Sequence, residues 1–115
     1  MPFIEKALNG HKMVKSFSVE NLDDYILLHI TRNSAKSLIT IWVSDAYFFW
    51  VSQYYERPKN IDFIYLAKPE ASYSDEIVDF VTKDGLNIWK FWALMGVLYQ
   101  DNIADYIPPE RRKDE

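Results

Sequence analysis

The density of aromatic side chains constrains this chain more than any other feature of its sequence. Four tryptophans, eight tyrosines and seven phenylalanines occur among 115 residues, which makes 17% of the chain aromatic. Each such ring buries about 150–250 Å² when it is fully covered. Because the interior of so short a chain is limited, we expect several rings to lie at the surface, in a cleft or between subunits.

Length and composition predict one folded domain over residues 1–109, followed by a charged, flexible tail over residues 110–115. The hydrophobic content of 49% and charged content of 26% are close to the globular average. The chain has no cysteine, which excludes disulfides and thiolate metal sites. No apolar run reaches the length of about 20 residues that spans a bilayer, so we expect a cytoplasmic protein with no membrane partner.

The first two thirds of the sequence predict short helices and then a sheet. Helices are expected over residues 2–8 and, after Ser18 as N-cap, over residues 19–24. Four segments rich in β-branched and aromatic residues follow: 25–32, 37–43, 46–56 and 61–68. Residues 46–56 could instead form a helix capped by Ser44, but their Tyr, Phe, Trp and Val content favours a strand. Short links between the four segments predict an antiparallel meander.

The last third of the sequence predicts two helices. Ser74 is the expected N-cap of a helix over residues 75–83, which Gly85 ends. The second helix, from Asn87 to about Gln100, is apolar around nearly its whole circumference, as is typical of a buried helix. The predicted fold is therefore α+β, a four-stranded antiparallel sheet packed with short N-terminal helices and two C-terminal helices.

One predicted face of the sheet combines aromatic rings with small hydroxyls. It groups Tyr25, His29, Thr40, Trp42, Trp50, Ser52 and Tyr54. If a helix covers this face, the rings are ordinary core. If the face is exposed, it is a platform on which bases of single-stranded nucleic acid could stack, each base contributing about 1–3 kcal/mol.

Phosphate groups on such a platform would need cations at its rim. The candidates are Lys12, Lys15, Arg32, Lys36, Arg57 and Lys59. The layout resembles the sheet of RNA-recognition motifs, although the Lys/Arg-Gly-aromatic signature is missing and the strands follow one another directly. The net charge is −4, and the sequence has no stripe of basic residues of the kind found in duplex-DNA-binding proteins.

The predicted C-terminal helix offers a second surface. Trp89, Trp92 and Tyr99 lie on one side of it, and Gly96 between them would allow close approach of another subunit. Interfaces favour Trp, Tyr and Phe, and a two-fold homodimer is the commonest assembly. Alternatively, the helix is buried and these rings are core.

Sequence signatures of catalysis and cofactor binding are absent. The three glycines form no phosphate-binding loop, no nucleophile elbow occurs, and His11 and His29 are far apart without an H-E-x-x-H pattern. We therefore predict no catalytic residues, cofactor or metal. The sequence predicts a non-enzymatic binding module, homo-oligomeric or bound to another protein through exposed aromatics, with single-stranded nucleic-acid binding as the alternative.

Overall fold

The computed structural model describes residues 2–33, 36 and 38–107, and it confirms the predicted α+β class. The tail predicted over residues 110–115 lies outside the described residues. In chain order the elements are α1 (Pro2–Asn9), β1 (Val14–Asn21), β2 (Ile26–Arg32), β3 (Ile39–Ser44), β4 (Phe48–Phe49), α2 (Val51–Tyr55), β5 (Phe63–Leu66), β6 (Ser72–Tyr73), α3 (Ile77–Lys83), β7 (Asn87–Trp89), α4 (Phe91–Val97) and the 3-10 helix η1 (Ile103–Asp105).

The main sheet is mixed, with strand order β1-β2-β3-β5-β7. Its first three strands form an antiparallel meander, which roughly matches the predicted one. β5 then pairs parallel to β3, and β7 pairs parallel to β5. A parallel pair needs a long crossover, and residues 45–62, with β4 and α2, supply the one between β3 and β5. β4 also pairs with β6 in a small parallel ladder.

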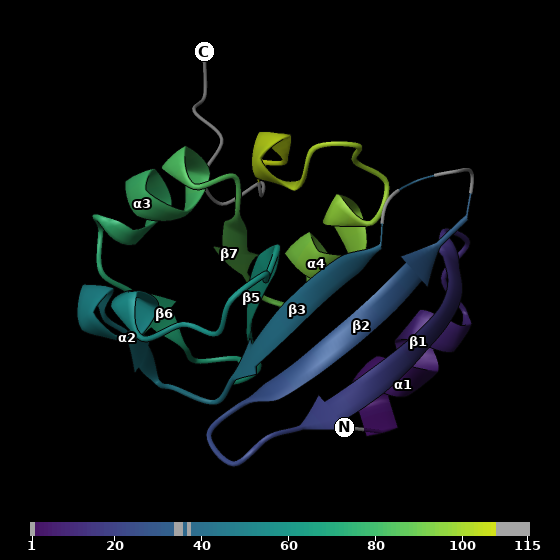
Figure 1. Ribbon diagram of the computed structural model, residues 1–115, viewed down its shortest axis with the longest axis horizontal. Helices are drawn as coiled ribbons and strands as arrows, with labels where there is room; N and C mark the ends of the chain where they lie inside the picture. Colours follow the sequence, from purple (N-terminus) through teal and green to yellow (C-terminus); the bar gives the residue numbers. More distant parts are fainter. Residues whose placement is uncertain (1, 34–35, 37, 108–115) are drawn as a thin grey trace.

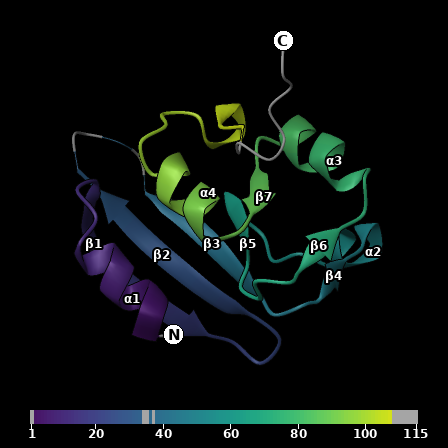
Figure 2. The same cartoon turned by 180° about the vertical axis from the view of Figure 1, so that it is seen from behind.

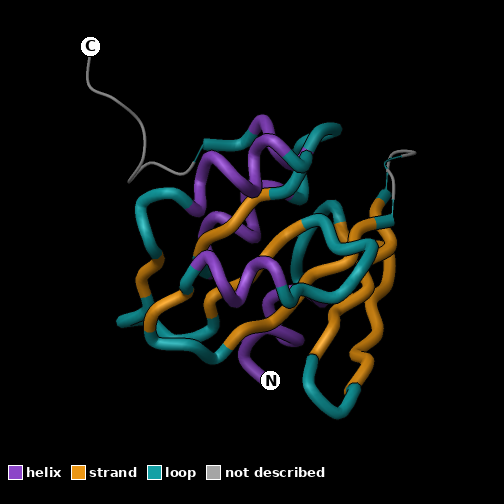
Figure 3. The backbone as a smooth tube through the Cα atoms, turned by 60° about the vertical axis from the view of Figure 1, so that its left-hand side comes forward, coloured by secondary structure: helices purple, strands orange, loops and turns teal. Residues whose placement is uncertain are grey.

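Both faces of the sheet carry helices. α1 and α4 pack on one face, where Leu8 and Leu94 join Leu28 and Ile41 in a cluster that excludes solvent. α2, α3 and the β4–β6 pair cover part of the other face. Figure 2 shows α1 and α4 in front of the sheet, and Figure 1 shows the opposite side. In Figure 3 the strands run between helical segments.

The strand predicted over residues 46–56 is wrong, because this stretch forms the two-residue β4 and then α2. Trp50 is the N-cap of α2 in extended conformation. Its backbone N–H donates to Oε1 of Gln53 at 2.7 Å, and its carbonyl accepts from the Gln53 N–H at 3.0 Å. These reciprocal bonds, three residues apart, satisfy backbone groups at the helix start and outweigh the β propensity of the rings.

The short helix predicted over residues 19–24 is also wrong. Residues 14–21 form β1, in which Phe17 and Val19 face the α1 side while Ser16, Ser18 and Glu20 face the other. Pairing with β2 explains the outcome, because Ser18 lies opposite His29 and Val19 opposite Leu28. Alternation of apolar and polar residues over the whole segment predicts the strand better than a capping residue at one position.

The C-terminal third differs from the prediction at the long helix and at the expected Ser74 cap of the helix before it. The long helix expected from Asn87 divides into β7 and α4. β7 is an edge strand covered by α3 and α4, and a covered strand can be as apolar as a buried helix. α3 begins at Ile77, whose N–H donates to the backbone carbonyl of Ser74 at 3.0 Å. The Ser74 hydroxyl makes no side-chain cap, and Gly85 ends the helix region with a φ of 79°. No helix in the described part of the chain has the length and apolarity to cross a bilayer.

Candidate binding sites

The structure places the predicted aromatic residues on different elements instead of on one open sheet face. Trp42 lies on β3 and is 9% exposed. It packs edge to face against Tyr25 and Phe49, with ring centroids 5.7 and 5.4 Å apart. Trp50 precedes α2, is 57% exposed and lies 4.3 Å from the Phe48 ring. Trp42 is therefore core, as in the alternative in which helices cover this face, and it is not available as part of an exposed platform.

Tyr54 belongs to α2 and is 1% exposed, so its predicted position on the sheet is wrong as well. Its hydroxyl donates to Oδ2 of Asp84 at 2.6 Å, which joins α2 to the end of α3. Burial, followed by this hydrogen bond, raises the pKa of Tyr54 above its ordinary value. Ser52, from the same predicted face, lies exposed on α2.

His29 and Thr40 lie together on the part of this sheet face that remains open. The imidazole Nε2 is 2.8 Å from Oε1 of Glu20, and Nδ1 is 3.3 Å from the Thr40 hydroxyl. The three side chains come from β1, β2 and β3 and form one hydrogen-bonded chain across the strands. His29 is thus half-buried and held on both ring nitrogens, as expected for a structural histidine.

The six cations predicted to contact phosphates do not form a common rim. Lys12 and Lys15 are exposed near β1, whereas Arg32 is 4% exposed. Its Nη1 donates to the carbonyls of Leu98 and Gln100 at 3.2 and 2.7 Å, and burial lowers the pKa of its guanidinium. Arg32 therefore fastens the chain after α4 to β2, which corrects its predicted phosphate-binding role.

Lys36 is likewise engaged within the chain, 2.5 Å from Oδ1 of Asp101. This bond and the charge of Lys36 lower the pKa of the Asp101 carboxyl. Of the six predicted cations, Arg57 and Lys59 line one pocket together.

The residues predicted to contact another subunit have different exposures. Trp89 is half-buried on β7, edge to face with Tyr73 at 5.1 Å. Trp92 and Tyr99 are 78% and 52% exposed. The predicted close approach at Gly96 is wrong, because a Cβ there would lie 2.5 Å from the Tyr106 ring. A side chain of the same chain already fills that space.

An apolar pocket of about 380 Å³ lies beside Trp92. Tyr65, Leu66 and Ala67 at the end of β5 form one part of its wall, and Pro69, Phe91 and Trp92 form another. Phe91 and Trp92 pack edge to face at 5.0 Å. The Lys90 ammonium donates to the Pro69 carbonyl and lies 4.9 Å from the centroid of the Trp89 ring.

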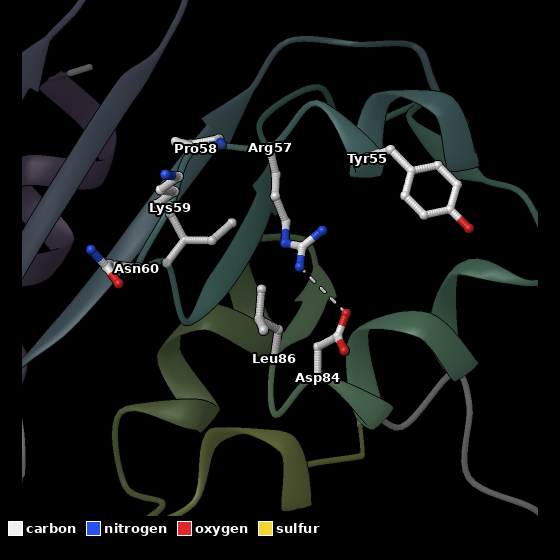
Figure 4. Close-up of a pocket in the computed structure, with 8 residues that line it drawn as sticks. Tyr55, Arg57, Pro58, Lys59, Asn60, Asp84 and Leu86 are labelled. Atoms are coloured by element: carbon white, nitrogen blue, oxygen red, sulfur yellow. Dashed lines mark hydrogen bonds and ion pairs between the residues drawn. The ribbon is translucent and has the colours of Figure 1, made fainter.

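A second pocket, of about 580 Å³, lies between the end of α2, the turn at residues 57–61 and the end of α3. Figure 4 shows Arg57 between Tyr55 on one side and Lys59 and Asn60 on the other, with its guanidinium directed toward Asp84. Residues 57–60 are the short link between the segments predicted over 46–56 and 61–68. The sequence does not indicate that Asp84 and Leu86 lie opposite this link.

Comparisons with protein-family models, with curated proteins and with solved structures find no match to this chain. Within the described residues, no group of three or more His, Asp or Glu side chains is placed to hold a metal ion. Among the pockets lined by described residues, those beside Trp92 and Arg57 also carry an aromatic ring that is more than half exposed, Trp92 in one and Tyr55 in the other.

Proposed function

We propose that this chain is a non-enzymatic interaction module that forms a homodimer through the surface around Trp92. The observation that supports the proposal is the 78% exposure of this indole beside an apolar pocket of the same chain. Burying a large apolar side chain is favourable by about 1.5–3 kcal/mol. Tryptophan is also the residue type most enriched among those that dominate binding energy at interfaces.

A second copy of the chain fits this surface because the projecting Trp92 side chain and the apolar pocket lie next to each other. In a two-fold interface the same patch on both protomers must be complementary to itself. Trp92 of one protomer can enter the partner's pocket beside Pro69 and Phe91, while the partner's Trp92 enters the first pocket. Each protomer thus supplies one projecting ring and one cavity.

The exposed face of α4 extends this surface. Trp92, Met95 and Tyr99 are spaced three and then four residues apart, so they lie along one side of the helix and of the turn that follows. Tyr99 is supported by His11, whose ring lies 5.0 Å away and whose Nε2 is 3.1 Å from the Met95 carbonyl. These contacts hold the stripe in place before any partner binds, which reduces the entropy lost on association.

Sedimentation equilibrium over a wide concentration range tests the proposal, with Trp92→Ser as the disrupting variant. The wild-type chain should dimerise as concentration rises, and Trp92→Ser should remain monomeric with an unchanged circular dichroism spectrum. Trp50→Ser is the matched control, because it removes another exposed indole outside this surface and should dimerise like the wild type. A wild-type chain that stays monomeric at millimolar concentration would refute the homodimer.

The predicted alternative, single-stranded nucleic-acid binding by stacking on the sheet, finds less support because Trp42 and Tyr54 are buried. One observation still favours a ligand with phosphate and a ring. Arg57 and Lys59 line the same pocket as the exposed ring of Tyr55.

A further inference from the structure

We propose that the pocket around Arg57 binds a small organic phosphate whose planar ring stacks on Tyr55. The pocket shares no lining residue with the cavity beside Trp92, so the proposal stands independently of dimerisation. A phosphate that carries a ring is shared by free nucleoside monophosphates and by the end of a single-stranded nucleic acid.

The guanidinium of Arg57 is fixed before any ligand arrives. Nη1 donates to the Tyr54 carbonyl at 3.1 Å, and Nη2 is 3.5 Å from Oδ2 of Asp84. The guanidinium carbon also lies 4.1 Å from the centroid of the Tyr54 ring. A guanidinium has five N–H donors, and these contacts use two of them. An anion can therefore bind to a donor group that loses little conformational freedom.

The charges lining the pocket favour an anion. Lys59 and Asn60 are exposed at its edge, and neither side chain makes a hydrogen bond to any described residue. Asp84 is the one carboxylate in the lining, and its Oδ2 already accepts from Tyr54 and contacts Arg57. The lining thus keeps an excess of one positive charge in a chain whose net charge is −4.

The turn that presents these groups has a defined conformation. Asn60 has a φ of 64°, a left-handed value that asparagine tolerates better than most residues. Directly after it, the side chain of Ile61 is buried and turns the chain toward β5. Lys59 and Asn60 are therefore held at the pocket edge by a turn anchored in the core.

The rest of the pocket suits the organic part of the ligand. Ile61 and Leu86, which are 6% and 7% exposed, contribute apolar surface, and Pro58 adds a rigid ring. Tyr55 packs edge to face against Phe80 at 5.8 Å and is still 66% exposed, so much of its ring remains accessible for stacking. The volume of about 580 Å³ lies within the range of about 300–1,000 Å³ that is typical of small-molecule sites.

The test is a two-dimensional ¹H–¹⁵N NMR titration with adenosine monophosphate, adenosine, inorganic phosphate and oligo-dT. Adenosine monophosphate should bind saturably, with shifts confined to residues 54–61 and 84–86, and should bind more tightly than adenosine or phosphate alone. Added salt should weaken the binding, because it screens the exposed charges. No saturation at 10 mM adenosine monophosphate, or shifts centred elsewhere, would overturn the proposal.

Variants separate the two parts of the site. Lys59→Gln should weaken adenosine monophosphate and phosphate binding at least threefold, and Tyr55→Ser should weaken the nucleotide while leaving phosphate unchanged. Lys6→Gln, which removes an exposed lysine on α1, is the matched control and should bind like the wild type. Equal losses in Lys59→Gln and Lys6→Gln would show general charge attraction and overturn the site.

The oligo-dT titration identifies the source of the ligand. Tighter binding of oligo-dT than of adenosine monophosphate, with the same residues shifted, supports the site with a nucleic-acid strand as its ligand. Binding of the mononucleotide alone supports the site with a free nucleotide. Because Trp92→Ser leaves the pocket intact, it should bind as the wild type does, whether or not the chain dimerises.

Discussion

Two adjacent rows of residues on the same face of the main sheet differ in their surroundings. The first, here called the apolar row, runs across the strands through Leu27, Trp42, Ile64 and Ile88, each opposite the next. The second, the polar row, runs through Ser18, His29 and Thr40. α2, α3 and the β4–β6 pair cover the apolar row, whereas the polar row is exposed or half-buried. Helices and the β4–β6 pair therefore cover one row of this sheet face and leave the adjacent row open.

The two rows hold the strands together by different interactions. The apolar row removes large side chains from water, which is the dominant stabilising contribution in folding. In the polar row, His29 bonds to Thr40 on β3 and, diagonally, to Glu20 on β1, a residue that lies opposite Leu27 at the end of the apolar row. A hydrogen bond contributes only about 0.5–1.5 kcal/mol net, because water competes for both partners. Substitutions in the two rows should therefore differ clearly in cost.

The largest effect is expected for Trp42→Ala in the apolar row. Truncation of a buried Trp or Phe to Ala lowers the free energy of unfolding by about 3–5 kcal/mol, since it combines lost burial with a cavity. Equilibrium urea denaturation followed by circular dichroism measures this change. Trp50→Ala, an exposed indole on the same side of the molecule, should cost no more than about 1.5 kcal/mol, the value of its contact with Phe48. Similar losses in both variants would contradict the assignment of Trp42 to the core.

An intermediate effect is expected for Tyr54→Phe, which removes the bond that fastens the covering helix α2 to Asp84. The bond is to a charged carboxylate, which would favour a larger loss, but that carboxylate is 41% exposed and water can replace the donor. The free energy of unfolding should therefore fall by about 1.5 kcal/mol at pH 7, the low end for hydrogen bonds to charged groups. The measurement is again urea denaturation. A variant as stable as the wild type would show that the hydroxyl contributes nothing to holding the cover in place.

The same tyrosine predicts a dependence on alkaline pH. Burial and the Asp84 bond raise the pKa of Tyr54 in the folded chain above the unfolded value of about 10. Its contribution is complete below pH 10 and is lost as the pH rises from there toward the folded pKa, because only the unfolded chain ionises. Burial shifts the pKa of Tyr65 in the same direction. Between pH 9 and 11, the free energy of unfolding of Tyr54→Phe should therefore fall less than that of the wild type. Some loss should remain, because the pKa of Tyr65 is raised as well.

The sequence predicted the elements whose pattern is local. The bounds of β2 and β3 differ from those of the predicted segments by at most two residues. Their apolar residues are continuous, and turn residues mark their ends. α1, which spans Pro2–Asn9, was predicted over residues 2–8. β5 was predicted as an antiparallel strand because residues 46–56 were not recognised as a crossover, and β7 was predicted as the start of a helix.

The candidate sites were predictable only in part. Trp92 was singled out from its helical spacing, and Arg57 and Lys59 from their charge. Their surroundings were not predictable, because Leu86 and Asp84 reach the pocket from another part of the chain, and Tyr106 reaches Gly96 from beyond α4. Aromatic density did indicate that some rings would be exposed. Which of them are exposed depends on the apolar row and its cover, and not on how many rings the chain contains.

The smallest effect is expected in the polar row, and it tests the distinction between the rows most sharply. His29→Ala removes both side-chain hydrogen bonds of His29 at a half-exposed position, so it should lower the free energy of unfolding by about 0.5–1.5 kcal/mol. In a double-mutant cycle with Glu20→Ala, the coupling energy should be about 0.2–1 kcal/mol, the value usual for exposed charged or polar pairs. Ser18→Ala, on the same row without a side-chain bond to His29, should stay within about 0.5 kcal/mol of the wild type. If His29→Ala instead lowered the free energy of unfolding as much as Trp42→Ala does, the polar row would belong to the core. The two rows would then not differ in how far helices cover them.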